Sequence, residues 1–160
     1  MSVWPDPVER VSALLREAGV ESTVEEFAEG TPTAEAAARA AGCTTGQIVK
    51  SLVFAGDGEF ALALVPGDMR ADRSRIATEC GWSKARMATA EEVHAVTGFE
   101  PGGVAPFPRG EVAHVLMEPT FMRYEVVWVG AGTHSHMAML SPLDLERLSE
   151  ARAASISDPG

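Results

Sequence analysis

The strongest constraint on the fold is a pair of apolar segments joined by a very short connection. QIVKSLVFA (residues 47–55) and EFALALVP (residues 59–66) have the composition of β-strands, and only GDG separates them. A parallel crossover needs a dozen or more residues, so the two strands must pair antiparallel as a hairpin. The first strand carries apolar residues at both odd and even positions, so it belongs inside a sheet that is covered on both faces.

One charged residue interrupts that apolar strand. Lys50 shares its face with Ile48, Leu52 and Phe54, while Val49 and Val53 occupy the other face. One interpretation is an edge-strand lysine that prevents aggregation, or one whose ammonium group reaches water along its own aliphatic stem. The other is a cation held at the rim of a pocket, where partial desolvation strengthens its field toward an anion or a carbonyl group.

Helix signals alternate with strand signals over the remaining chain. Helices are expected at 8–18, 33–42, 71–81, 89–98 and from residue 141, with caps at Asp6, Thr33, Thr89 (paired with Glu92) and Ser141. Further strands are expected at 111–119, 124–132 and 136–140. The pattern predicts a single α/β domain over residues 1–150, with a mixed, strongly curved, barrel-like sheet flanked by short helices. Residues 151–160 are expected to form a frayed tail.

Composition and charge exclude several classes of protein. The chain has 160 residues and a formal net charge of -10, which argues against indiscriminate binding to DNA or to an anionic membrane. The sequence contains no signal peptide pattern and no apolar stretch long enough to span a membrane, so a cytoplasmic protein is expected. Cys43 and Cys80 are far apart and are expected to be reduced core residues.

A loop rich in glycine and proline, GFEPGGVAPFPRG (residues 98–110), is the second feature that suggests chemistry. Gly102 and Gly103 allow positive φ angles and close approach of the backbone to a ligand. The prolines stiffen the segment, so its N–H groups can be held toward an anion or a developing oxyanion. The plain alternative is a connecting loop without a function.

The order of these motifs resembles a known family. QIVKSLVF, ALALVPGD, TGFEPGGVAPF, VVWVGAG and SPLDL, within residues 31–148, are similar to the YbaK-type editing domain. That domain occurs inserted in bacterial prolyl-tRNA synthetases and as free-standing aminoacyl-tRNA deacylases. The resemblance implies hydrolysis of the ester that joins a wrong amino acid to a tRNA, with the acceptor end of the tRNA as partner and a synthetase as a second candidate partner.

The resemblance also implies roles for particular residues. Lys50 matches the strand lysine of the family, which is thought to hold the terminal phosphate or the substrate, and Gly102 and Gly103 belong to the loop that orients the ester. A water molecule attacks, helped by a hydroxyl group of the substrate, and neither a metal nor another cofactor is implied. The residues expected to bind substrate are Gly98, Val104, Ala105, Pro106 and His134.

A cluster of basic residues marks a candidate surface for the tRNA. Five cations lie between residues 70 and 86, in a chain that is otherwise acidic: Arg70, Arg73, Arg75, Lys84 and Arg86. They form either a solvated helix face with internal ion pairs or a docking surface for the phosphates of the acceptor stem. The acidic segment 21–30 is expected to face away from the RNA.

The sequence therefore favours a trans-editing deacylase over two alternatives. The first alternative is a non-catalytic module that binds a nucleotide or an aminoacyl-adenosine in the same pocket. The second is a metal-dependent hydrolase that uses His114, His134 and His136, although no telling ligand spacing accompanies them. Alanine, proline, cysteine, serine and threonine all stay open as the amino acid removed.

Overall fold

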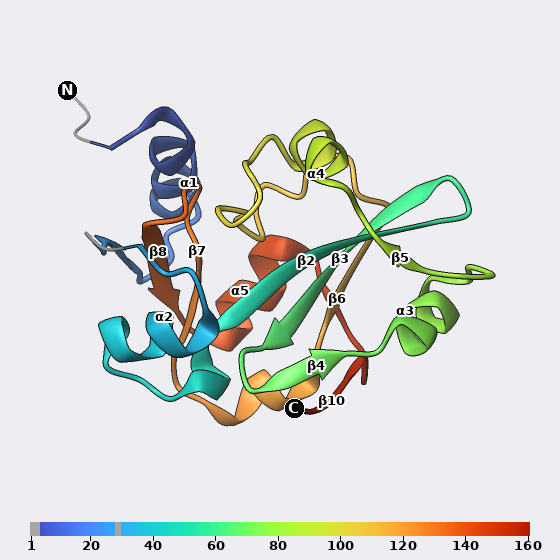
Figure 1. Ribbon diagram of the computed structural model, residues 1–160. Coiled ribbons are helices and arrows are strands. Elements are labelled where there is room, and N and C mark those ends of the chain that lie inside the picture. The colour runs from blue at the N-terminus through green and yellow to red at the C-terminus, as the bar shows by residue number, and fades with distance from the viewer. Residues whose placement is uncertain (1–3, 28–29) are drawn as a thin grey trace.

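The expected hairpin forms the centre of the larger of two main sheets. The computed structural model describes residues 4–27 and 30–160 (Figure 1). The five strands of this sheet follow the order β5-β2-β3-β6-β9: β2 (Val49–Gly56), β3 (Glu59–Pro66), β5 (Arg86–Met87), β6 (His114–Met117) and β9 (Arg152–Ala153). β2 pairs antiparallel with β3, whereas β3 pairs parallel with β6, so the sheet is mixed.

A second sheet lies beside the start of β2 in Figure 1. It contains β1 (Thr23–Glu26), β8 (His136–Leu140) and β7 (Val127–Gly130), all antiparallel. One parallel bridge between Ile48 and Trp128 joins the two sheets. A separate two-stranded ribbon pairs β4 (Met69–Ala71) with β10 (Ser157–Pro159).

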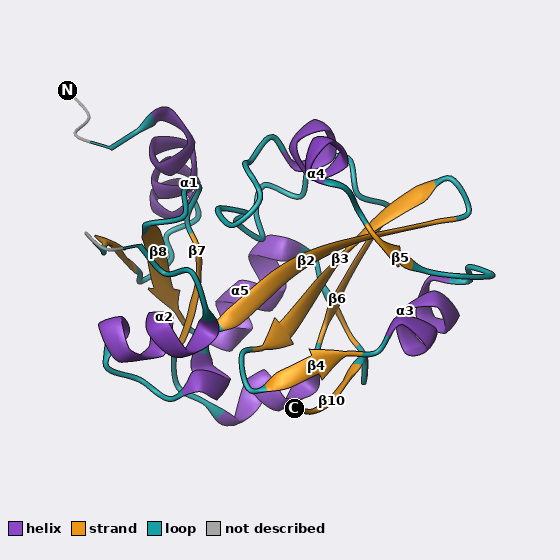
Figure 2. Cartoon of the chain, viewed as in Figure 1, coloured by secondary structure: helices purple, strands orange, loops and turns teal. Residues whose placement is uncertain are grey.

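Short helices surround the sheets (Figure 2). They are α1 (Asp6–Glu17), α2 (Ala34–Ala41), α3 (Arg73–Cys80), α4 (Ala90–Thr97) and α5 (Pro142–Ser149), with 3-10 turns η1 (Thr45–Gln47) and η2 (Pro119–Arg123). The predicted caps at Thr33 and Ser141 and the Thr89 capping box are confirmed, because each side chain accepts the expected backbone N–H. Asp6 is not a cap: helix α1 begins at Asp6 itself, after Pro5.

The two faces of β2 bury side chains in different cores, as its alternation predicts. Val49 and Val53 belong to the main cluster, which packs between the sheets with residues of α1, α4 and α5. Leu52 and Phe54 belong to a second cluster with α3 and the ribbon strand β4. The prediction of a strand covered on both sides is therefore confirmed.

Two expectations about the architecture need revision. The mixed α/β class is confirmed, but the sheets formed by the described residues stay open, and a barrel-like form is not confirmed. Residues 151–160 do not fray: β9 extends the five-stranded sheet and β10 pairs with β4. The reason is burial, since Ile156 is 0% exposed and Ser157 is 3% exposed. A segment that buries apolar surface and pairs its backbone has no reason to detach.

Candidate active site

A cleft of about 380 Å³ opens where the two sheets meet. One wall is Ile48 with the first half of β2, from Val49 to Leu52. The segment 31–34 and Ala37 of α2 form a second wall, and Gly102 and Val104 of the loop 98–110 form a third. The fourth wall combines residues from β7, β8 and the turn between them: Gly130, Thr133, His136 and Met137. This volume is at the small end of the range for small-molecule sites, about 300–1,000 Å³.

The cleft exists because one edge of β2 is only partly paired. Among the described residues, this edge of β2 pairs with β5 at Phe54 and Ala55, and one further bridge lies at Ile48. The carbonyl of Val53 accepts from the N–H of Ala88, so odd-numbered residues of β2 direct their backbone groups toward this edge. Ser51 therefore presents its main chain toward the cleft rather than toward β3.

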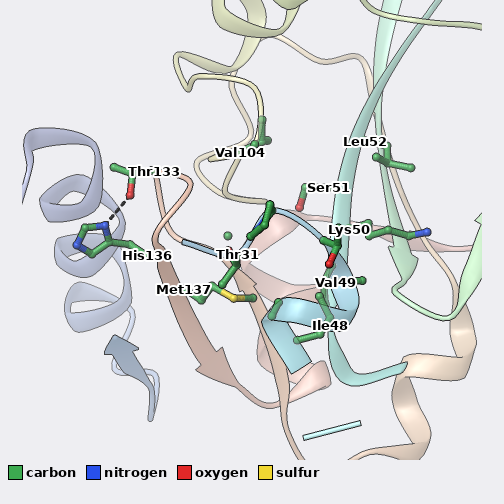
Figure 3. A pocket seen from close by; sticks show the side chains of 16 residues that line it. Thr31, Ile48, Val49, Lys50, Ser51, Leu52, Val104, Thr133, His136 and Met137 are labelled. Atoms are coloured by element: carbon green, nitrogen blue, oxygen red, sulfur yellow. Dashed lines mark hydrogen bonds between the residues drawn. The ribbon is translucent and has the colours of Figure 1, made fainter. Parts of the chain in front are cut away.

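The side chains of Lys50 and Ser51 extend in opposite directions from β2 (Figure 3). Ser51 lies on the side of the strand toward Val104, whereas Lys50 and Leu52 extend away from it. The Lys50 ammonium group donates a hydrogen bond to the backbone carbonyl of Met69 in β4. Lys50 thus contributes to the rim of the cleft, while its charge lies beside the ribbon of β4 and β10.

Both burial and neighbouring charges affect the pKa of the Lys50 ammonium group. Desolvation lowers the pKa of its ammonium group, and the carboxylates of Glu35 and Asp68 partly oppose that effect, while Arg70 adds to it. Glu35 belongs to the first turn of α2, so the positive N-terminal end of this helix lies near the same group. The rim at Lys50 therefore combines two cations and a helix terminus with two carboxylates.

Ser51 carries the one buried side-chain polar atom of the described residues that has no hydrogen-bond partner. An unpaired buried hydroxyl costs about 1–3 kcal/mol, so such groups need an explanation. Rotation about χ1 of Ser51 redirects its hydroxyl without breaking an existing hydrogen bond. We did not predict Ser51 from the sequence, although its position next to Lys50 already required it to face the opposite way.

The loop 98–110 approaches the turn between β7 and β8 very closely. A Cβ atom on Gly103 would lie 2.7 Å from the Cα of Thr133, so only glycine fits there. The N–H of Gly103 donates to the carbonyl of Glu100, and its carbonyl accepts from the N–H of Gly132. The N–H groups of Gly102 and Val104 have no hydrogen-bond partner in the described parts of the chain. Those two amides, rather than that of Gly103, are free to receive a ligand.

The other predicted substrate-binding residues are not among those that line the cleft. Gly98 ends helix α4 in the left-handed conformation and donates to His94. Ala105 and Pro106 are buried behind Val104 in the loop, with Ala105 part of the main core. His134 is exposed, and its ring lies 3.2 Å from where a Cβ on Gly30 would be.

Thr133 and His136 line the cleft in the place where the sequence favoured His134. The Thr133 hydroxyl forms a hydrogen bond with Nδ1 of His136 and accepts the N–H of Ser135 at 3.2 Å. His136 is 3% exposed, and its Nε2 lies 3.7 Å from a carboxylate oxygen of Glu26. The spacing T-x-x-H across a tight turn was the available signal for this pair.

The three histidines do not form a metal centre. His114 contacts Glu59 and the ring of Trp82, which are different partners from those of the Thr133–His136 pair. Within residues 4–27 and 30–160, no group of three His, Cys, Asp or Glu side chains is arranged to hold a metal ion. Cys43 and Cys80 are both free thiols, and burial raises the pKa of Cys80 to about 11.

The five basic residues separate into two groups. Arg75 pairs with Asp72 and Asp158, and Arg86 forms a two-pronged contact with Glu92. By contrast, Arg73 and Lys84 flank a second groove, of about 430 Å³, which Ser74, Thr78 and Ser83 also line. Arg70 is exposed on β4 and close enough to Lys50 to affect its pKa.

Fold and cleft together define a class of protein, the aminoacyl-tRNA deacylases that edit mischarged tRNA. A crystal structure of a candidate trans-editing enzyme for prolyl-tRNA synthetase superimposes with a TM-score of 0.87 at 33% identity, over 97% of this chain and 99% of that one. Residues 28–148 match the family model of the aminoacyl-tRNA editing domain. The chain belongs to this family, which confirms the resemblance found in the sequence.

Two relatives illustrate the range within the family. YwhH of Bacillus subtilis is 33% identical over 81% of this chain and 82% of its own length. The multifunctional Ser/Thr-tRNA deacylase ProXp-y of Escherichia coli is 29% identical over 89% of this chain and 87% of its own length. In the part of the chain that the structure describes, no helix combines the length and the apolar character needed to cross a bilayer.

Proposed function

We propose that this protein is a free-standing trans-editing enzyme whose cleft between β2 and the loop 98–110 hydrolyses a mischarged aminoacyl-tRNA. The observation that carries the proposal is a family cleft of amino-acid size in which loop amides without partners lie opposite the main chain of β2. A water molecule attacks the ester carbonyl carbon, the carbon–oxygen ester bond breaks, and the ribose oxygen takes up a proton. The chain supplies position and electrostatics, because the ester is already activated.

The rim at Lys50 is the proposed site for the phosphate of the terminal nucleotide. Lys50, Arg70 and the N-terminus of α2 supply donors there, beside the carboxylates of Glu35 and Asp68, and their place at the rim suits a phosphate better than a carbonyl deep in the cleft. The direction of the Lys50 side chain supports this role over direct contact with the reacting carbonyl. A phosphate anchored at the rim directs the ribose and the aminoacyl group inward.

The amides of Gly102 and Val104 are the proposed donors to the oxyanion. Neither N–H has another partner, and both residues line the cleft. Donors that are fixed before reaction stabilise developing charge without reorganisation, and one such donor is typically worth about 10²–10³ in kcat. Gly103 holds the loop against Thr133 and positions these donors rather than acting itself.

Ser51 is the proposed contact for a polar group of the aminoacyl moiety. Its hydroxyl is unpaired without substrate, so a hydrogen bond to substrate removes a penalty as well as adding an interaction. A site built around such a hydroxyl favours small polar amino acids, and the Ser/Thr-tRNA deacylase among the relatives makes serine and threonine the first candidates.

For the tRNA itself, Arg70, Arg73 and Lys84 are the proposed phosphate contacts. Arg75 and Arg86 have carboxylate partners, whereas Arg73 and Lys84 have none among residues 4–27 and 30–160. Cations without internal partners are available to neutralise phosphates, and such contacts position an RNA without reading its sequence. Arg75 and Arg86 are assigned a role in stabilising the fold rather than in binding the tRNA.

The test is a deacylation assay on a panel of mischarged tRNAs that begins with seryl- and threonyl-tRNA. Lys50→Ala should lower kcat/KM mainly through KM. Arg147→Ala is the control, because it removes an exposed cation of helix α5 that none of the proposed contacts uses. Failure of the wild-type protein to release any amino acid from the panel, with binding of the tRNA end retained, would support the non-catalytic binding module instead.

A further inference from the structure

Residues 156–160 determine which backbone groups of β4 face Lys50. In the ribbon, the N–H of Gly160 donates to Asp68 and the N–H of Asp72 donates to Ile156. Even-numbered residues of β4 therefore bond to β10, and the carbonyl of Met69 points to the opposite side. That carbonyl is the acceptor of the Lys50 ammonium group. A one-residue slip of β10 would turn it away.

The sequence of β10 fits this register. Pro159 lies opposite Met69 at a position whose N–H would point away from β4, so the missing donor costs no ladder bond. Asp158 lies opposite Arg70 at the position where both backbone bonds are exchanged. Its side chain also pairs with Arg75 at 3.0 Å.

A buried carboxylate holds the start of β10 in place through hydrogen bonds. Glu118, 3% exposed, accepts the N–H of Ile156 at 2.9 Å and the hydroxyl of Ser157 at 2.7 Å. Ser157 also contacts the sulfur of Met69. A carboxylate taken out of water is retained only where donors compensate it, and here both donors come from β10 and the residue before it.

We propose that Glu118 and the segment 156–160 are the positioning elements that place the Lys50 ammonium group at the rim of the cleft. The chain of contacts runs from Glu118 to Ser157, through the ribbon register to the Met69 carbonyl, and from there to Lys50. The match to the family model ends at residue 148, so it does not include this segment. The consequence for catalysis rests on the proposed role of Lys50, whereas the placement of the ammonium group can be measured without it.

The experiment compares variants that release β10 in two different ways. Asp158→Pro removes the backbone donor that pairs with Arg70, and Asp158→Asn is its control, since it removes only the ion pair. Ser157→Ala leaves Glu118 with one donor fewer. Faster hydrogen exchange at the Asp72 amide, by about tenfold, reports that β10 has been released.

Competitive acylation then measures the placement of Lys50, with Lys84 as the internal reference. In a variant with released β10, the pH midpoint for labelling of Lys50 should rise toward the ordinary value of 10.5, with the labelling of Lys84 in the same sample as the internal standard. KM for the mischarged aminoacyl-tRNA should rise about five- to tenfold with kcat nearly unchanged, since a phosphate contact binds ground and transition states alike.

Two results would overturn the proposal, and a third would separate the placement of Lys50 from its proposed role. Unchanged labelling of Lys50 in a variant whose Asp72 amide has been released overturns it. Failure of both Asp158→Pro and Ser157→Ala to release that amide also overturns it, because the contacts named would then not hold β10. Altered labelling with unaltered KM keeps the placement and refutes the proposed role of Lys50 instead.

Discussion

Replacing Ser51 with alanine should make the protein more stable and less active. The Ser51 hydroxyl is buried without a partner, at a cost of about 1–3 kcal/mol. Alanine keeps the Cβ and removes the unpaired group, so after the loss of one atom's packing we expect a gain of about 1 kcal/mol. For a chain of 160 residues this raises Tm by about 2–4 °C. The loss of one neutral hydrogen bond to substrate should lower kcat/KM about five- to tenfold.

Ser149→Ala is the matched control, because the chemistry of the change is the same and the environment differs. The Ser149 hydroxyl is also buried, but it donates to the carbonyl of Leu145 at 2.7 Å. Its removal should lower the free energy of unfolding by about 1 kcal/mol and leave kcat/KM unchanged. Thermal unfolding and steady-state deacylation of both variants decide the matter. A lower Tm for Ser51→Ala would mean that the hydroxyl has a partner, and an unchanged kcat/KM would mean that it does not contact the substrate.

Three further predictions concern the loop, the surface and acid stability. Gly103→Ala should cost more in transition-state stabilisation, measured from kcat/KM, than in the free energy of unfolding, measured from Tm, because a Cβ 2.7 Å from the Thr133 Cα displaces the loop. An unchanged kcat/KM would show that the loop amides are dispensable. Lys84→Ala should reduce the salt dependence of tRNA binding by about one charge, measured as the slope of log K against log salt, and an unchanged slope contradicts the docking surface. The Arg86 guanidinium group, through its hydrogen bonds, lowers the pKa of Glu92 from 4.5 to about 2. The resulting stability is therefore present above about pH 4.5 and lost as pH falls toward 2, and Glu92→Gln should flatten acid unfolding curves over that window.

The local features of the fold were readable because their causes are local. The hairpin follows from two apolar strands and a connection too short for a crossover, and it formed with the turn at Asp57 and Gly58. Helix ends at Thr33, Thr89 and Ser141 follow from side chains that reach a backbone N–H three residues away. These interactions need no knowledge of the rest of the chain.

The strands that the sequence did not predict depend on distant partners. β4 has only three residues, too few for a periodic pattern, and it exists because β10 pairs with it from 88 residues further on. The N–H of Ile156 similarly depends on Glu118, which lies 38 residues earlier and accepts its hydrogen bond. β1 lies in an acidic segment that reads as polar surface, yet it pairs with β8 along its full length.

Three residues predicted for the site, Lys50, Gly102 and Val104, line the cleft, but the direction of the side chains along β2 was not predicted. Alternation required Lys50 and Ser51 to face opposite ways, but it could not say which face borders the cleft. That depends on where the pairing of β2 with β5 stops, which is a tertiary property. The same limit explains why Thr133 and His136, and not His134, line the wall.

The bridge between Ile48 and Trp128 has a practical consequence for changing what the enzyme accepts. Within the described residues this is the one β-bridge between the two sheets, so the cleft takes its walls from two sheets that otherwise meet through side chains of a shared core. Under the proposed function, replacing Met137 on β8 with a smaller residue enlarges the cleft for a bulkier amino acid and leaves the hydrogen bond from Lys50 to the Met69 carbonyl untouched. A selectivity library for this scaffold therefore starts on β8 and leaves the central hairpin untouched.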